Sequence, residues 1–121
     1  MNRSKQAVMP AYTDGCFALY DIVDEKEGDQ ERVIRERPGY DEIWYRELAV
    51  YDRTRITFEQ ADMEISMKVC IPKWDGISSS CVCIIDDVQY KVYNKANVVS
   101  RQGYPETELT LIRPSMDYEV I

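Results

Sequence analysis

The sequence contains no histidine, and this absence excludes the commonest designs of enzyme active sites. Serine and cysteine nucleophiles are usually activated by a neighbouring imidazole. The chain also lacks the glycine-rich sequences that bind dinucleotides or cradle phosphates. Carboxylate pairs that could supply an acid and a base do occur, but such pairs arise by chance among 22 acidic residues. We therefore expect a protein that is not an enzyme.

The four cysteines form no Cys-x-x-Cys pair, and without histidine they cannot complete the usual zinc clusters. A site of four thiolates remains an alternative, because Cys81 and Cys83 leave the same face of a strand and Cys70 and Cys16 could join them. The favoured interpretation is four reduced thiols, most of them small apolar core residues. We expect no metal and no other cofactor.

No apolar run approaches the ~20 residues of a membrane span, and residues 1–14 lack the apolar core of a secretory signal. These absences predict a soluble protein that stays inside the cell that makes it. The chain also lacks a basic run: 15 basic residues stand against 22 acidic residues, for a net charge of −7. This balance argues against direct binding to a phosphate backbone.

What the sequence does contain is the composition of one folded domain, with 121 residues of which 45% are hydrophobic. Residues 1–14 are polar and show no repeated apolar spacing, which predicts a flexible N-terminal arm. We expect residues 15–114 to form the domain and residues 115–121 to form a C-terminal tail.

Alternation of apolar and polar residues predicts about six short strands. In the first strand, Phe17, Leu19 and Val23 share one face, and a charged loop over residues 24–31 leads to a return strand at Val33. The clearest alternation places four residues on one face of a strand over residues 64–71: Ile65, Met67, Val69 and Ile71.

Later segments of the chain predict a hairpin and a closing strand. The strands over residues 81–85 and 88–93 are joined by a tight turn at Asp86-Asp87. Residues 94–106 are polar and are expected to connect this hairpin to a last strand over residues 107–113.

The centre of the chain allows two interpretations. Residues 43–51 favour a strand, although a helix is an alternative, and the Thr57–Gln60 spacing predicts a short helix over residues 58–63. The predicted fold class is therefore mainly β, a small antiparallel β-barrel or sandwich of about six strands with one short helix.

Aromatic residues and arginines are concentrated around residues 44–55. Tyrosine, tryptophan and arginine dominate protein interfaces, but core packing explains buried aromatic side chains equally well. The candidate interaction residues are Trp44, Tyr45, Arg46, Tyr51, Arg53, Arg55 and Trp74.

Five segments, taken in order and with their spacing, resemble the head-closure proteins of tailed bacteriophages, also called head-tail joining or stopper proteins, from phages and prophages of Gram-positive bacteria. The segments are GCFALY (residues 15–20), VYDRTRITFE (50–59), KVCIP (68–72), CIIDDVQYKV (83–92) and GYPETELTL (103–111). The similarity covers about residues 15–114, and none of the segments is diagnostic singly.

The resemblance implies a structural virion protein that is assembled in the cytoplasm of a bacterial host. It implies a small β-barrel that docks as a ring of copies beneath the portal and adaptor, retains the packaged DNA, and offers the tail a docking surface. Genome DNA would pass through the channel without specific binding, and no membrane is involved. The candidate channel-loop residues are Asp24, Glu25, Glu27, Asp29, Glu31, Lys73 and Asp75.

Two alternatives remain open. One is an intracellular β-barrel that binds a cellular protein as an inhibitor or adaptor, and the other is a tail-completion protein of the same virion. If the neck interpretation holds, we expect a monomer in isolation, because the net charge of −7 opposes association of free copies.

Overall fold

A computed structural model describes residues 11–25, 32–50 and 65–121, and every regular element in these ranges is a β-strand. The strands are β1 (Gly15–Glu25), β2 (Arg32–Glu36), β3 (Ile43–Leu48), β4 (Ile65–Pro72), β5 (Cys81–Ile85), β6 (Val88–Val99), β7 (Pro105–Ile112) and β8 (Glu119–Val120). The predicted mainly β class is confirmed. The short helix expected over residues 58–63 lies outside the described residues. No helix suited to crossing a membrane occurs in the described ranges.

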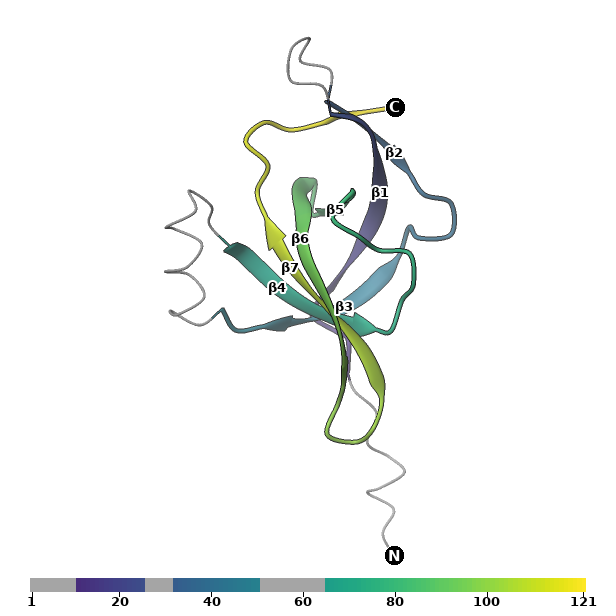
Figure 1. Cartoon of the computed structure of the whole chain (residues 1–121), viewed down its shortest axis with the longest axis vertical. Helices are drawn as coiled ribbons and strands as arrows, with labels where there is room; N and C mark the ends of the chain where they lie inside the picture. The colour runs from purple at the N-terminus through teal and green to yellow at the C-terminus, as the bar shows by residue number, and fades with distance from the viewer. Residues whose placement is uncertain (1–10, 26–31, 51–64) are drawn as a thin grey trace, which may run out of the picture.

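Six strands close into an antiparallel barrel in the order β1, β3, β4, β7, β6 and β5 (Figure 1). Closure depends on β1, whose residues 15–17 pair with residues 43–45 of β3 and whose residues 18–21 pair with β5. Beyond the barrel β1 continues and pairs with β2, which in turn carries β8 on its other edge. Of the barrel and sandwich architectures that were expected, the structure is the barrel.

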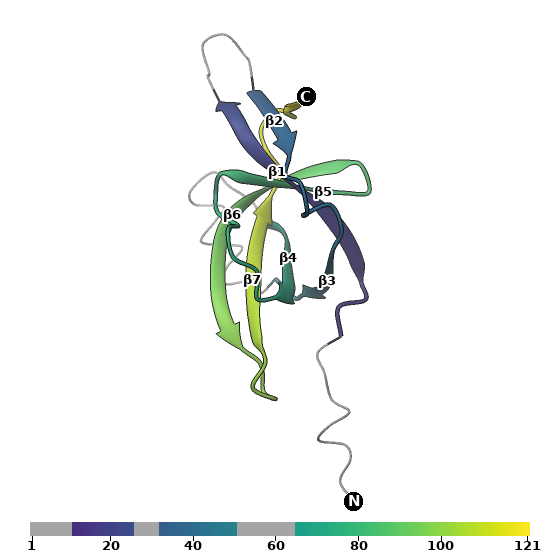
Figure 2. The ribbon, with the colours of Figure 1, turned by 90° about the vertical axis from the view of Figure 1, so that its right-hand side faces the viewer.

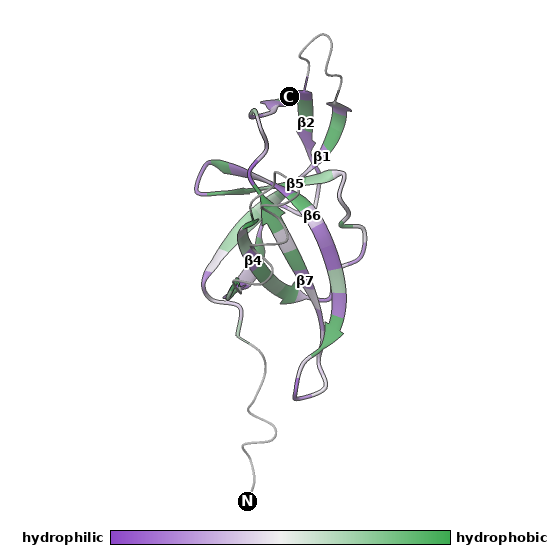
Figure 3. Cartoon of the chain, turned by 60° about the vertical axis from the view of Figure 1, so that its left-hand side comes forward, coloured by the Kyte–Doolittle hydropathy of each residue, from purple (hydrophilic) through white to green (hydrophobic). Residues whose placement is uncertain are grey.

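The barrel interior is filled by side chains that alternate along the strands, as expected from the sequence. The main core contains Phe17 and Leu19 of β1, Val69 and Ile71 of β4, Cys81 and Cys83 of β5, and Leu109 and Leu111 of β7. Figure 3 shows these apolar stretches along the strands of the barrel. The prediction that Cys81 and Cys83 are small buried residues on one strand face is confirmed.

The prediction that Val23 shares the buried face of Phe17 and Leu19 is wrong, because Val23 is 49% exposed. A register shift in the pairing with β2 falls between Ile22 and Asp24, where β1 has already left the barrel. The irregularity interrupts the alternation at Val23, and this side chain belongs to neither of the two apolar cores.

The tight turn at Asp86-Asp87 is present and joins β5 to β6. Both residues have positive φ angles, 50° and 65°. Two successive residues with positive φ are the feature of the type I′ turn, whose twist matches that of the flanking strands.

Residues 94–106 are not the polar connection expected from the sequence. β6 continues to Val99, and β7 begins at Pro105, so the two strands form a long hairpin that projects beyond the barrel (Figures 1 and 2). Main-chain pairing runs from Lys91–Ile112 to Val99–Pro105, with one register shift between Val92 and Asn94. Backbone hydrogen bonds form these strands, and they do not require the apolar alternation that the sequence lacks here.

Residues 115–121, expected as a tail, return to the fold. Tyr118 is 4% exposed and packs with Ile34 and Val82 in a second, smaller core. The Gln89 side-chain amide donates to the Tyr118 carbonyl at 2.9 Å and its oxygen accepts from the Tyr118 amide at 2.7 Å. This double hydrogen bond places β8 beside β2.

We predict that Asp87→Gly raises the free energy of unfolding by about 0.5–1 kcal/mol, because glycine tolerates the left-handed conformation at lower cost than aspartate. Thermal or denaturant unfolding measures the change. The matched control is the reverse change, Gly103→Ala. Gly103 has a φ of +87°, and an added Cβ would have no neighbour within 4 Å, so alanine adds backbone strain without a steric clash. The free energy of unfolding of this variant should therefore fall. A loss of stability in Asp87→Gly would contradict the turn assignment.

Candidate functional site

Trp44, Tyr45 and Arg46 are consecutive on β3, so they point alternately to its two faces. Tyr45 points inward: it is 5% exposed, and its ring centroid lies 6.2 Å from that of Phe17. Trp44 is 48% exposed on the outer face, and Arg46 lies on that face too. The structure therefore places Tyr45 in the core and leaves Trp44 and Arg46 as interaction candidates.

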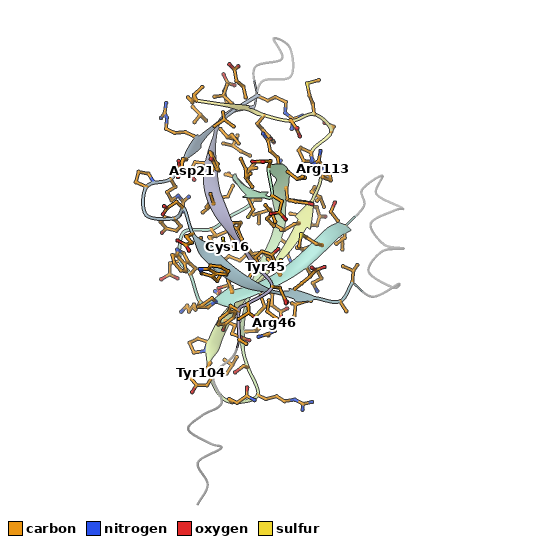
Figure 4. The ribbon with its side chains drawn as sticks, turned by 180° about the vertical axis from the view of Figure 1, so that it is seen from behind. Cys16, Asp21, Tyr45, Arg46, Tyr104 and Arg113 are labelled. Atoms are coloured by element: carbon orange, nitrogen blue, oxygen red, sulfur yellow. The ribbon has the colours of Figure 1, made fainter. Side chains whose placement is uncertain are left out.

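Arg46 belongs to an ionic cluster on the outer face of β3, β4 and β7. Glu106, at the start of β7, is only 3% exposed and accepts a hydrogen bond of 2.6 Å from the Tyr12 hydroxyl. Arg46 Nη1 lies 3.5 Å from the same carboxylate oxygen, and its guanidinium lies 5.8 Å from the Tyr12 ring centroid. Figure 4 shows Arg46 and Tyr45 with Cys16, where β3 meets β1.

The charge on Glu106 is stabilised by its donors. Burial raises the pKa of this carboxyl, but hydrogen bonds from Tyr12, the Cys70 thiol and Arg46 outweigh it and hold the pKa below its ordinary value. Burial and the nearby carboxylate raise the pKa of Tyr12 and raise that of Cys70 to about 12. Cys70 is therefore a protonated thiol at neutral pH.

The four cysteines do not come together. Cys81 and Cys83 face the barrel core, whereas Cys70 contacts Glu106 and Arg46 on the outer side of β4. Within the described ranges, no group of three cysteine, aspartate or glutamate side chains could hold a metal ion. The alternative of a four-thiolate site is thus not formed.

The last residues of the expected N-terminal arm are bound to the barrel. Besides Tyr12, Asp14 pairs with β3: its amide donates to the Tyr45 carbonyl at 3.0 Å, and its carboxylate accepts from the Glu47 amide at 2.7 Å. The outer face around Arg46 is therefore partly covered by residues 12–14.

Trp74 belongs to a second cluster, built around Arg37 in the connection between β2 and β3. Arg37 donates two hydrogen bonds to the Asp21 carboxylate, one of them at 3.0 Å, and one to the Gly76 carbonyl at 2.7 Å. The Tyr40 ring lies 4.7 Å from the Arg37 guanidinium and 5.6 Å from the Trp74 ring. The Arg37 guanidinium lowers the pKa of the Asp21 carboxyl. It also links the β2–β3 connection, which contains Arg37, and the β4–β5 connection, which contains Gly76, to β1.

The other candidates are distributed over separate places. Asp24 is half-buried near the end of β1, whereas Lys73 and Asp75 are exposed in the connection between β4 and β5. Glu25 is the last residue of β1. The remaining candidates lie outside the described residues: Tyr51, Arg53, Arg55, Glu27, Asp29 and Glu31.

The two clusters contain residues to which no sequence pattern pointed: Tyr12, Arg37, Tyr40 and Glu106. Tyr12 and Glu106 are 94 positions apart in the chain. A pairing over such a distance leaves no signal in local spacing.

The sequence matches no known protein-family model and no curated protein.

We predict that Tyr12→Phe lowers the free energy of unfolding at neutral pH by about 1–2 kcal/mol, because a buried carboxylate loses a hydrogen-bond donor. The folded-state pKa of Glu106 is depressed, so its stabilising contribution is present above its ordinary pKa of 4.5 and is lost as the pH falls through the folded value. Denaturant unfolding at neutral and acidic pH should show a smaller acid sensitivity in the variant. Tyr104→Phe is the control, and equal effects of the two variants would contradict the role of Tyr12.

We predict that Arg37→Lys lowers the free energy of unfolding by about 1 kcal/mol, because lysine cannot make the paired hydrogen bonds to Asp21 or the planar contact with Tyr40. Arg35→Lys, on an exposed neighbour in β2, should leave the denaturation midpoint unchanged. An unchanged midpoint in Arg37→Lys would show that the cluster does not stabilise the fold.

Proposed function

We propose that this protein is a structural component of a phage neck, which docks as a ring under the portal and adaptor, closes the DNA-filled head and joins it to the tail. The main observation in support is the closed β-barrel, because it is the architecture that the resemblance to head-closure proteins implies. In addition, Trp44 is exposed on the outer face of this barrel.

The surroundings of Trp44 suit a docking surface. A tryptophan ring offers a large contact area with little conformational entropy to lose, and such residues are enriched among binding hot spots. Arg46 is two positions along the same strand face and is oriented by Glu106 and Tyr12. This rigid β3 face is the proposed contact with the ring above or below.

The charge of the chain supports the second part of the proposal. With a net charge of −7, a ring of copies would present a wall that repels DNA phosphates, so the genome would slide past without binding. Among the described channel-loop candidates, Asp24 and Asp75 would add to this repulsion. The same charge opposes association of free copies, which supports a monomer before docking and a ring after it.

Docking can be tested with DNA-filled, tail-less heads that carry the portal and adaptor, taken from the phage or prophage that encodes the chain. The purified protein should co-sediment with these heads and prevent leakage of DNA. We predict that Trp44→Ala weakens this binding by at least about tenfold while the barrel stays folded, as expected for an interface anchor. Far-UV circular dichroism checks the fold.

The matched control is Tyr93→Ala, which removes an aromatic ring that is 42% exposed on β6, three strands from β3 in the barrel order. This variant should bind heads as the unaltered protein does. Equal losses in the two variants would remove the β3 face from the interface. If the unaltered protein does not bind competent heads, the neck proposal fails, and a cellular partner or the tail end becomes the better hypothesis.

A further inference from the structure

Most of the exposed large hydrophobic side chains lie at one end of the molecule, and one lies at the opposite end. Seven such residues are exposed in the described ranges, and Val99 of the β6–β7 hairpin is the most exposed at 69%. Four others lie at the opposite end of the long axis, formed by β1, β2 and the C-terminal residues (Figures 1 and 2). They are Val23, Met116, Val120 and Ile121.

The end of the β6–β7 hairpin is held in one conformation by hydrogen bonds. Three hydrogen bonds close its turn: the Ser100 amide donates to the Tyr104 carbonyl at 2.8 Å, the Gly103 amide to the Ser100 carbonyl at 2.9 Å, and the Tyr104 amide to the Ser100 hydroxyl at 3.1 Å. The pairing of β7 with β4 ends at Glu106–Pro72, so residues 98–105, here called the hairpin tip, extend past the barrel wall. A preorganised tip loses little entropy when it docks.

The two ends also differ in charge. The hairpin tip contains Arg101 and no acidic residue. The opposite end, here called the β1–β2–β8 end, comprises the described residues 24, 32–36 and 115–121, which contain four acidic and two basic residues. One of these two, Arg32, is already engaged by Ser115 and Tyr118. A tip that carries one cation and one exposed valine is thus matched by an acidic end with four exposed apolar side chains on the same chain.

We propose that the hairpin tip of one copy docks on the β1–β2–β8 end of the next copy, with Val99 against the exposed side chains around Val120 and Arg101 facing Glu119. Different surfaces of the two copies meet in such a contact, so repetition produces a ring if the rotation closes and a filament if it does not. The assignment of this contact to a closed ring rests on the proposed neck function, whereas the contact itself rests on the two ends.

The contact should be weak between free copies. Few side chains take part, an exposed ion pair contributes little, and each copy carries a net charge of −7. Copies held together on a template would associate because their effective concentration is high. Covalent trapping is therefore a better test than the size of the free protein.

The test uses the full chain with Arg101→Lys, treated with a carbodiimide that joins amines to carboxylates in contact. We expect cross-linked dimers and larger species in which the peptide carrying residue 101 is joined to the peptide carrying Glu119 or Asp117. The β6–β7 hairpin and the C-terminal residues lie at opposite ends of one molecule, so such a link connects two copies. Adding Val99→Asp should lower the yield about tenfold, and adding Tyr93→Ala, which removes a ring that is 42% exposed on β6 outside both proposed contact surfaces, should change it little.

A charge exchange tests the geometry independently. Arg101→Glu alone and Glu119→Lys alone each lack one partner of a 101–119 link, so neither should yield it, whereas a mixture of the two variants should. Absence of this link from both the mixture and the Arg101→Lys chain would overturn the proposed contact. If heads bind the protein but no link forms, the proposed contact between copies is wrong and the neck function stands. If links form but heads do not bind the protein, the contact between copies stands and the neck function is wrong.

Discussion

The pairing of β1 with two partners at once is the constraint on which the rest of the structure depends. β1 joins β3 through its first residues and β5 through its middle, and this closes the barrel and leaves it without free edges between these strands. Gly15 permits the close approach at this seam, because an added Cβ would lie 2.7 Å from the Tyr45 hydroxyl oxygen. Once the seam is closed, Tyr45 is enclosed in the core and its neighbours Trp44 and Arg46 are held outward.

Two ionic clusters then connect distant segments to this frame. Glu106 receives Tyr12 from the N-terminal side and Arg46 from β3, while Asp21 receives Arg37 from the connection after β2. A buried or half-buried carboxylate is stable only with enough donors, so each cluster fixes the positions of the segments that supply them. The surface offered to a partner is therefore set by polar pairing as much as by the apolar core.

The molecule is also asymmetric along its length. The β6–β7 hairpin and the β1–β2–β8 end extend from opposite ends of the barrel; the hairpin tip carries Val99 and Arg101, and the other end carries four exposed apolar side chains and an excess of acidic residues. Exposed apolar side chains that gather at one end of a small domain are suited to a contact there. The proposed assembly uses the β3 face for docking to another ring and the two ends for contacts between copies.

The mainly β class, the inward faces of the strands at Leu19, Val69 and Cys83, and the Asp86-Asp87 turn are all predictable from the sequence, because strand alternation and turn conformation are local properties. The sequence did not determine the length of the β6–β7 hairpin, whose strands are made by backbone pairing without apolar alternation. Nor did it separate Tyr45 from Trp44, since only the closed barrel decides which face is inside. The Tyr12–Glu106 and Arg37–Asp21 contacts came from the tertiary structure alone, because they join residues far apart in the chain through side chains whose partners no local pattern specifies.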